Sequence, residues 1–124
     1  MRDSIAATYG HGTENDFVVI FDPADEIDIT PEIVTRICDR KAGIGADGVI
    51  RIVKGERHWF MDYRNADGSI AEMCGNGIRV MARYLVERGH QPEGIFAIDT
   101  RDGLKHLRVP MTEDISVNMG KIYD

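Results

Sequence analysis

The stretch CGNGIRVMARYLVERG, residues 74–89, is the part of the sequence that decides the fold. Its polar side chains between positions 78 and 88 are Arg79, Arg83, Glu87 and Arg88. The first three of these fall on one narrow line at i, i+4 and i+8, and every other position in that range is apolar or aromatic. An ordinary surface helix buries one stripe, whereas this helix needs cover on most of its circumference. We therefore predict that a sheet of six or seven strands wraps around it, and that Gly89 ends it as a left-handed cap.

The rest of the chain supplies these strands and one further helix. Thr30 as N-cap, Pro31 at the first helical position and Gly43 as a stop predict a helix between them. Short β-rich runs bounded by turn residues predict the strands, at 5–9, 17–21, 49–53, 59–63, 95–100, 104–109 and 115–119. An Asp102-Gly103 turn is expected between two of these runs. The predicted fold is α+β, with a mixed and mainly antiparallel sheet around a central helix, in a single domain over residues 1–124.

Composition limits the classes of function that the chain can have. Its 124 residues carry a formal net charge of -6, so no large basic face is expected for nucleic acid or for an anionic membrane. The polar beginning, MRDSIAATYG, does not resemble a signal peptide, and no apolar run approaches the roughly 18 residues of a membrane span. We expect a cytoplasmic protein with a small-molecule or protein partner. In that reducing compartment the two cysteines are expected to be thiols.

Cys74 stands directly before a Gly-Asn-Gly run that opens the long helix. The glycines leave backbone N–H groups accessible at the helix N-terminus, where the aligned dipoles favour an anion such as a carboxylate or phosphate. The same field lowers the pKa of a neighbouring thiol and produces a usable thiolate. The simpler alternative is a buried cysteine that only packs above its helix. Gly75 and Gly77 are unfavourable for a helix and have no packing reason in the sequence, which favours the functional interpretation.

Other candidate sites have weaker support. GIGADG at 43–48 has the G-x-G-x-x-G spacing of a dinucleotide-binding turn, but a helix precedes it and a strand follows, which is the reverse of the required order. Cys38 lies on the apolar face of the first predicted helix and is expected in the core. The basic segment TRDGLKH at 100–106 is expected to be a solvated turn. The four histidines have no metal-ligand spacing, so no metal site is predicted; they are His11, His58, His90 and His106.

Four segments resemble the N-terminal half of the diaminopimelate epimerase family, which are cofactor-independent amino-acid isomerases. They are GTENDFVVI (12–20), CDRKAGIGADGVI (38–50), NADGSIAEMCGNGIR (65–79) and VNMG (117–120). The resemblance runs in order over nearly the whole chain and implies a half-barrel fold. Proline racemase and hydroxyproline epimerase share the architecture but have Cys-Gly-His-Gly at this motif. Asn76 therefore distinguishes the two groups, and a proline racemase-type isomerase is the related alternative.

The resemblance also implies roles for individual residues. Cys74 matches one of two catalytic cysteines that face opposite sides of the substrate α-carbon. Gly75 and Asn76 match residues that hold the reacting α-carboxylate, in agreement with the helix-terminus argument. Asn15 and Asn65 match asparagines that read the distal amino-acid end, although from the residues alone both are more typical of turns.

Two departures from the family pattern accompany these matches. The family commonly reads Gly-Leu-Gly-Asn-Asp-Phe where this chain has GHGTENDF at 10–17. A family glutamine near the end of the glycine-rich segment is replaced by Gly48, which is not expected to be a ligand.

The implied reaction is the epimerisation of LL- to meso-diaminopimelate in the lysine and peptidoglycan-precursor pathway. Inversion of an α-carbon requires a base on one face and an acid on the other, and no cofactor. The resemblance implies that a C-terminal half donates the opposing cysteine and a glutamate-arginine pair, so this chain alone is expected to be inactive. Its partner would be that C-terminal half, or a second copy in a homodimer. Two alternatives from other classes are a catalytically silent amino-acid or anion-binding module and a redox-sensing thiol protein.

Overall fold

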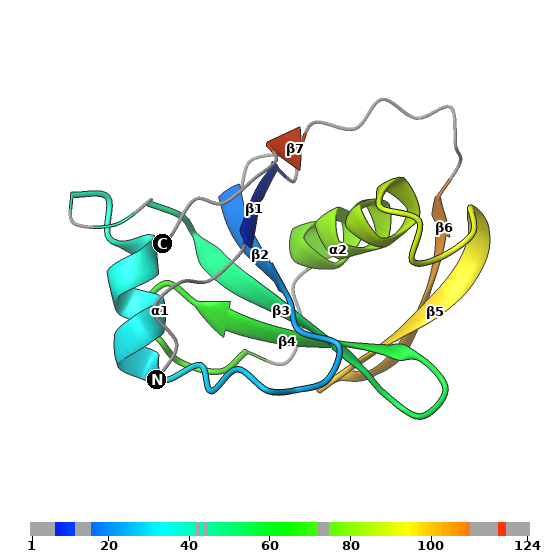
Figure 1. Ribbon diagram of the computed structural model, residues 1–124, viewed down its shortest axis with the longest axis horizontal. Coiled ribbons are helices and arrows are strands. Elements are labelled where there is room, and N and C mark those ends of the chain that lie inside the picture. The colour runs from blue at the N-terminus through cyan, green and yellow to red at the C-terminus, as the bar shows by residue number, and fades with distance from the viewer. Residues whose placement is uncertain are drawn as a thin grey trace.

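A single curved sheet and two helices make up the protein in a computed structural model that describes residues 7–11, 16–41, 43, 45–71, 75–109 and 117–118 (Figure 1). The elements in chain order are β1 (Ala7–His11), β2 (Asp16–Phe21), α1 (Pro31–Cys38), β3 (Gly48–Lys54), β4 (Trp59–Asn65), α2 (Gly75–Glu87), β5 (Gly94–Thr100), β6 (Gly103–Val109) and β7 (Val117–Asn118). None of the helices in these residues is long and apolar enough to cross a membrane.

The described strands form one sheet of seven in the order β6-β5-β4-β3-β2-β1-β7. Neighbours β2 and β3 run parallel, as do β4 and β5, and the other neighbouring pairs are antiparallel. The α+β class and the mixed sheet expected from the sequence are therefore confirmed. The sheet curves around α2, while α1 lies on its opposite face (Figure 1).

Helix α2 is covered on most of its surface, as its sequence predicts. Its described apolar side chains are all buried, from Ile78 to Val86, and they pack on alternate residues of the sheet. These sheet residues are Phe17 and Val19 of β2, Ile50 and Ile52 of β3, Met61 and Tyr63 of β4, and Ile98 of β5. On the polar line, Arg79 and Glu87 are exposed and Arg83 is half-buried.

The ends of α2 agree with the prediction. The helix begins at Gly75, so the Gly-Asn-Gly run opens it and forms its first turn. At the other end Gly89 has φ 80°, its N–H donates to Val86 O at 3.1 Å, and the His90 N–H donates to Leu85 O at 2.8 Å. This left-handed cap is the one predicted. Arg88 follows the helix and places the central carbon of its guanidinium 4.8 Å from the centroid of the Tyr84 ring.

Helix α1 begins as predicted but ends earlier. The Thr30 hydroxyl accepts a hydrogen bond from the Ile33 N–H at 3.2 Å, and Pro31 is the first helical residue. The prediction of an end at Gly43 was wrong, because α1 ends at Cys38. The following chain folds back, and a Cβ at Gly43 would lie 2.0 Å from Arg36 O. Gly43 is thus required by close backbone packing over the helix end, not as its stop.

The side of the sheet opposite α2 carries α1 and, beside it, a group of buried charges. Asp62 of β4 is 1% exposed and accepts hydrogen bonds from three arginines. The donors are Arg51 Nε at 3.0 Å, Arg64 Nε at 2.9 Å and Arg101 Nη1 at 2.8 Å. The solvated turn expected in residues 100–106 is present, since Arg101 and Asp102 are exposed, but Arg101 also pairs with Asp62, which was not predicted. The turn residues are Arg101 and Asp102, since Thr100 pairs with Gly103, one position earlier than predicted.

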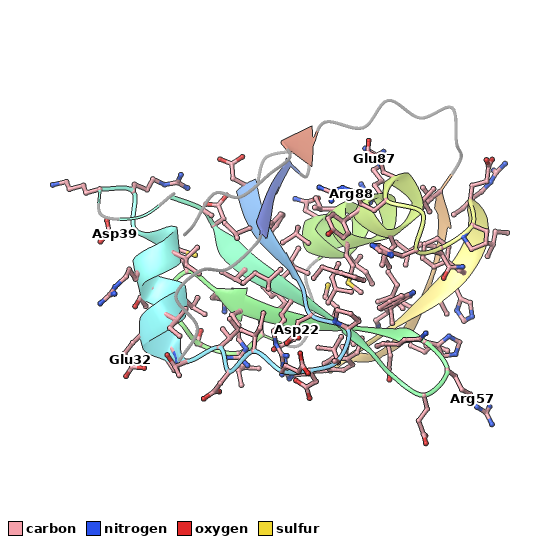
Figure 2. The ribbon with its side chains drawn as sticks, in the orientation of Figure 1. Asp22, Glu32, Asp39, Arg57, Glu87 and Arg88 are labelled. Carbon is pink, nitrogen blue, oxygen red and sulfur yellow. The ribbon has the colours of Figure 1, made fainter. Side chains whose placement is uncertain are left out.

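Arg51 extends this group to the segment that follows β2. Its Nη1 lies 2.8 Å from Asp22 Oδ2 and 2.6 Å from Asp25 Oδ1. Asp22 is 5% exposed and also accepts the backbone N–H groups of Glu26 and Ile27, each at 2.9 Å. Figure 2 shows Asp22 on the side of the sheet away from α2. We call the set Asp22, Asp25, Arg51, Asp62, Arg64 and Arg101 the Asp62 network.

Candidate functional site

Three strand ends meet at the end of the sheet toward which the Gly75 end of α2 is directed (Figure 1). Strands β2 and β3 begin here and β4 ends here, with Phe17 opposite Gly48 and Gly48 opposite Asn65. Asp16 and Asp47 tie the first two strands, because the Asp16 N–H donates to Asp47 Oδ2 at 2.9 Å. The sheet topology thus brings segments that are distant in sequence to the same end of the sheet, which faces the start of α2 (Figure 1).

Asn65 closes a tight loop at this end of the sheet. Its side-chain Nδ2 donates to Ser69 Oγ at 3.1 Å, and its backbone N–H donates to Ser69 O at 2.9 Å. Its own carbonyl accepts the Gly68 N–H at 2.8 Å, and Gly68 has φ 89°. This is the turn-forming role that the residue type alone favours. The role of Asn65 as a substrate ligand stays a prediction.

The first turn of α2 has the chemistry of an anion cradle. Its first four backbone N–H groups have no acceptor within the helix, and the turn contains no acidic residue to neutralise the positive dipole end. Gly75 is exposed, and a Cβ built on it meets no described atom within 4 Å. Asn76 is half-buried and Gly77 is buried. A carboxylate can therefore approach the backbone at Gly75 closely.

Two of the predicted site residues, Cys74 and Asn15, lie outside the described residues. In the sequence Cys74 directly precedes the first residue of α2, and Asn15 directly precedes the first residue of β2. The candidate site is therefore described here through Asn65, Gly75 and Asn76.

Cys38, the other thiol, is a core residue as predicted. It is 5% exposed and packs with Val34 and Ile37 of α1 against Val18 and Ile20 of the sheet. Burial raises the pKa of its thiol to about 11. The thiol therefore stays protonated at neutral pH, on the sheet face opposite α2.

The GIGADG segment follows α1 and leads into β3, which is the order expected for a segment that does not bind a dinucleotide. A Cβ on Gly48 would lie 2.7 Å from Tyr63 Cε1 and 2.8 Å from Arg64 O, so this position is glycine because of strand packing. Within the described ranges, no three His, Cys, Asp or Glu side chains come together in an arrangement that could hold a metal ion.

Sequence reasoning did not identify two cavities of the described structure. One of about 280 Å³ is lined by the β3–β4 hairpin together with Gln91, Phe96 and Ala97. The other, of about 400 Å³, lies between α2 and β6 and is lined by Arg79, Ala82, Arg83, His106, Leu107, Arg108 and Val109. Neither contains Asn65, Gly75 or Asn76. In the sequence, the i, i+4 spacing of Arg79 and Arg83 was the one signal of the second cavity, because it places both side chains on one face of the helix.

Comparison with known proteins adds a family to this geometry. The profile of the family described as Diaminopimelate epimerase matches residues 7–123. A protein named diaminopimelate epimerase from Streptomyces coelicolor is 48% identical, over 98% of this chain and 46% of its own length. One of the same name from Thermobifida fusca is 49% identical, over 91% of this chain and 47% of its own length. The chain thus spans about half the length of the curated relatives it matches.

Solved structures with low sequence identity have a similar fold. A phenazine biosynthesis protein from Bacillus anthracis has a TM-score of 0.68 at 19% identity, over 94% of this chain and 39% of its own. A methylitaconate-delta-isomerase has a TM-score of 0.59 at 16% identity, over 90% of this chain and 35% of its own. The family profile spans nearly all of the chain, and the two relatives are 48% and 49% identical to it over more than nine-tenths of its length. This chain therefore belongs to the diaminopimelate epimerase family.

Proposed function

We propose that this chain supplies one half of the active site of a diaminopimelate epimerase, an isomerase that converts LL- to meso-diaminopimelate without a cofactor. Family membership supports the reaction class. The observation that carries the site is the start of α2 at Gly75, directly after Cys74 in the sequence. A thiol directly before the first turn of a helix, whose N–H groups have no acceptor within the helix, supports the chemistry that α-proton removal beside a carboxylate requires.

In the proposed reaction Cys74 acts as base or acid on one face of the α-carbon. As a thiolate it takes the α-proton, and the electron pair of the broken C–H bond stays on the substrate as an enolate-like carbanion. A second thiol on the opposite face then gives its proton to the carbon and becomes a thiolate. Backbone N–H groups at Gly75 and Asn76 stabilise the negative charge that develops on the carboxylate. Protons and electrons balance without a cofactor.

The distal end of the substrate is assigned to Asn15 and Asn65. Asn65 ends β4, and Asn15 precedes β2, whose first residues align with Gly48 and Asn65 across the sheet. Asn65 therefore lies at the sheet end that α2 approaches with Gly75, and Asn15 directly precedes, in the sequence, the first residue of a strand that begins there (Figure 1). Amide side chains can both donate to a carboxylate and accept from an ammonium group, as the second amino-acid end of diaminopimelate requires.

The opposing thiol is assigned to a partner segment, because Cys38 is buried on the other face of the sheet. We place it, with a glutamate-arginine pair for the substrate, in a C-terminal half that corresponds to the rest of the relatives' length. In this proposal residues 1–124 are the N-terminal half of a two-domain enzyme. A homodimer that brings two Cys74 side chains together across a dyad is the second arrangement that supplies two thiols.

The test is to incubate the purified chain with stereochemically pure diaminopimelate in deuterium oxide and follow α-deuterium incorporation and inversion. We expect no inversion from the chain alone and recovery when a separately expressed C-terminal half is added. Cys74→Ala should abolish the recovered inversion, whereas Cys38→Ala should retain it. Inversion by a strictly monomeric chain would contradict the two-thiol mechanism.

Two further outcomes would replace the proposal. Diaminopimelate binding without exchange in any combination of halves would identify a silent binding module. Reversible oxidation of Cys74 that is insensitive to diaminopimelate, again without exchange, would identify a redox sensor.

A further inference from the structure

The cavity between α2 and β6, which we call the α2–β6 groove, is lined by several basic side chains. Arg79 and Arg83 line it from the helix, and His106 and Arg108 line it from the strand. Among the described residues of its lining there is no aspartate or glutamate, although the whole chain carries a formal net charge of -6. The groove therefore carries local positive charge, whereas the chain as a whole is negatively charged.

Gathering like charges is unfavourable, and a bound anion offsets that cost. Arg79 and Arg83 stand at i and i+4 on one helix, a spacing at which like charges destabilise the helix. Among the residues that the structure describes, neither Arg79 nor Arg108 takes part in an ion pair. The Asp62 network contrasts with Arg79 and Arg108, since each of its three arginines reaches a carboxylate.

The groove also has the size and floor of a ligand site. Its volume of about 400 Å³ falls within the usual range for small-molecule sites, which is roughly 300–1,000 Å³. Ala82, Leu107 and Val109 form the apolar part of the lining, so the groove can hold the carbon body of a ligand as well as its charge. Guanidinium groups match phosphate oxygens in pairs, and a phosphate ester carries close to two negative charges at neutral pH.

We propose that the α2–β6 groove is a binding site for a small phosphorylated metabolite, held by Arg79, Arg83 and Arg108. The site is separate from the proposed reaction site, because its lining includes none of Asn65, Gly75 and Asn76. It lies beside β6, the last strand of the described sheet.

The proposal is tested by calorimetric titration of the 124-residue chain with pyrophosphate. We expect saturable binding at one site that weakens as NaCl rises from about 50 to about 300 mM. The double variant Arg79→Gln/Arg83→Gln should bind at least about tenfold more weakly, a loss of about 1.4 kcal/mol. Arg36→Gln is the matched control, since Arg36 is also an exposed helical arginine but lies on α1, on the other face of the sheet. It should leave the affinity unchanged.

Thermal unfolding of each variant, followed by circular dichroism, ensures that only folded proteins are compared. No saturable binding, full binding by the double variant, or equal weakening by Arg36→Gln would each overturn the proposal. Asn76→His separates this site from the reaction site, because it should leave pyrophosphate binding intact. Loss of pyrophosphate binding in Asn76→His would place the anion at the start of α2 and reject the groove, whatever the epimerase assay shows.

Discussion

At the scale of single residues, the two thiols of this chain have opposite chemical surroundings. Cys38 is buried and its pKa is raised to about 11, so it is a weak nucleophile at neutral pH. Cys74 precedes the positive end of α2, where the pKa of a thiol is lowered from its usual value of about 8.5. We predict that iodoacetamide modifies Cys74 faster than Cys38 at neutral pH, with a rate that titrates below pH 8.5, as mass spectrometry of the two peptides would measure.

The control for this prediction is Cys38→Ala, which should leave the fast phase of alkylation unchanged. Diaminopimelate should slow that phase if it binds beside Cys74. Equal rates at the two cysteines, or titration of Cys74 at or above the usual value, would show that the helix terminus does not activate the thiol.

Asn76 is the residue that distinguishes this motif from the Cys-Gly-His-Gly form. It is half-buried in the first turn of α2, and the core side chains begin two positions later at Ile78. We predict that Asn76→His weakens diaminopimelate binding by the two-half enzyme about tenfold or more, because a hydrogen bond to a charged group contributes about 1.5–3 kcal/mol. The melting temperature should stay close to that of the parent. A large fall in melting temperature would identify Asn76 as a structural residue.

At the scale of elements, α2 combines a tightly packed body with a weak first turn. Alanine has a helix propensity up to about 1 kcal/mol better than glycine, and a Cβ at Gly75 meets no described atom within 4 Å. We therefore predict that Gly75→Ala leaves the free energy of unfolding unchanged or raises it by up to about 1 kcal/mol. Epimerisation by the two-half enzyme should nevertheless fall, because the methyl group would lie where the carboxylate approaches.

Gly89→Ala at the other end of α2 is the matched control for this effect. Gly89 has φ 80°, so alanine should destabilise the chain by about 1 kcal/mol while the reaction in the folded enzyme continues. Urea unfolding and the deuterium assay together separate the two glycines. Full activity in Gly75→Ala would show that the glycine is not needed for substrate.

At the scale of the whole molecule, the Asp62 network joins parts of the chain that are far apart in sequence. It connects β3, β4, the segment after β2 and the turn between β5 and β6. Removing one partner of a buried ion pair costs about 3–5 kcal/mol, since the remaining charges lose their compensation. We predict that Asp62→Asn lowers the free energy of unfolding at pH 7 by about 3 kcal/mol, as urea denaturation would measure.

The pH dependence of this effect has a definite sign. Burial acts to raise the pKa of Asp62, but hydrogen bonds and charges from Arg64 and Arg101 outweigh it, and the pKa is held below the ordinary value of 3.8. The stabilisation is therefore fully present above that value and is lost as the pH falls through the lower pKa of the folded state. The difference between the parent and Asp62→Asn should shrink below about pH 3.8.

Asp99→Asn, at an exposed position on β5, provides the comparison and should change stability by less than about 0.5 kcal/mol at either pH. A difference between the parent and Asp62→Asn that does not depend on pH would contradict the assignment of the effect to charge.

Several features were predictable from the sequence because they depend on neighbours within one or two turns of chain. The polar line of α2, its Gly89 cap, the Thr30-Pro31 start of α1 and the core position of Cys38 follow from periodicity and capping, and the structure confirms them. The runs predicted at 17–21, 49–53, 59–63, 95–100 and 104–109 all lie within observed strands. Cys74 and the residues beside it were singled out from a contiguous motif, and their role stays a prediction.

Only the tertiary structure decided how these elements meet. Strand order, the parallel pairing of β2 with β3, and the alignment of Gly48 with Asn65 depend on which distant segments share a hydrophobic face, and local periodicity does not contain that information. The same holds for the ion pair of Arg101, because only the fold brings this exposed turn residue to Asp62. It holds too for Gly43, where the chain folds back over α1. The neighbours of a residue in sequence determine its local conformation. Its contacts in the folded protein determine whether a charge is paired, as at Arg101, or whether only glycine fits, as at Gly43.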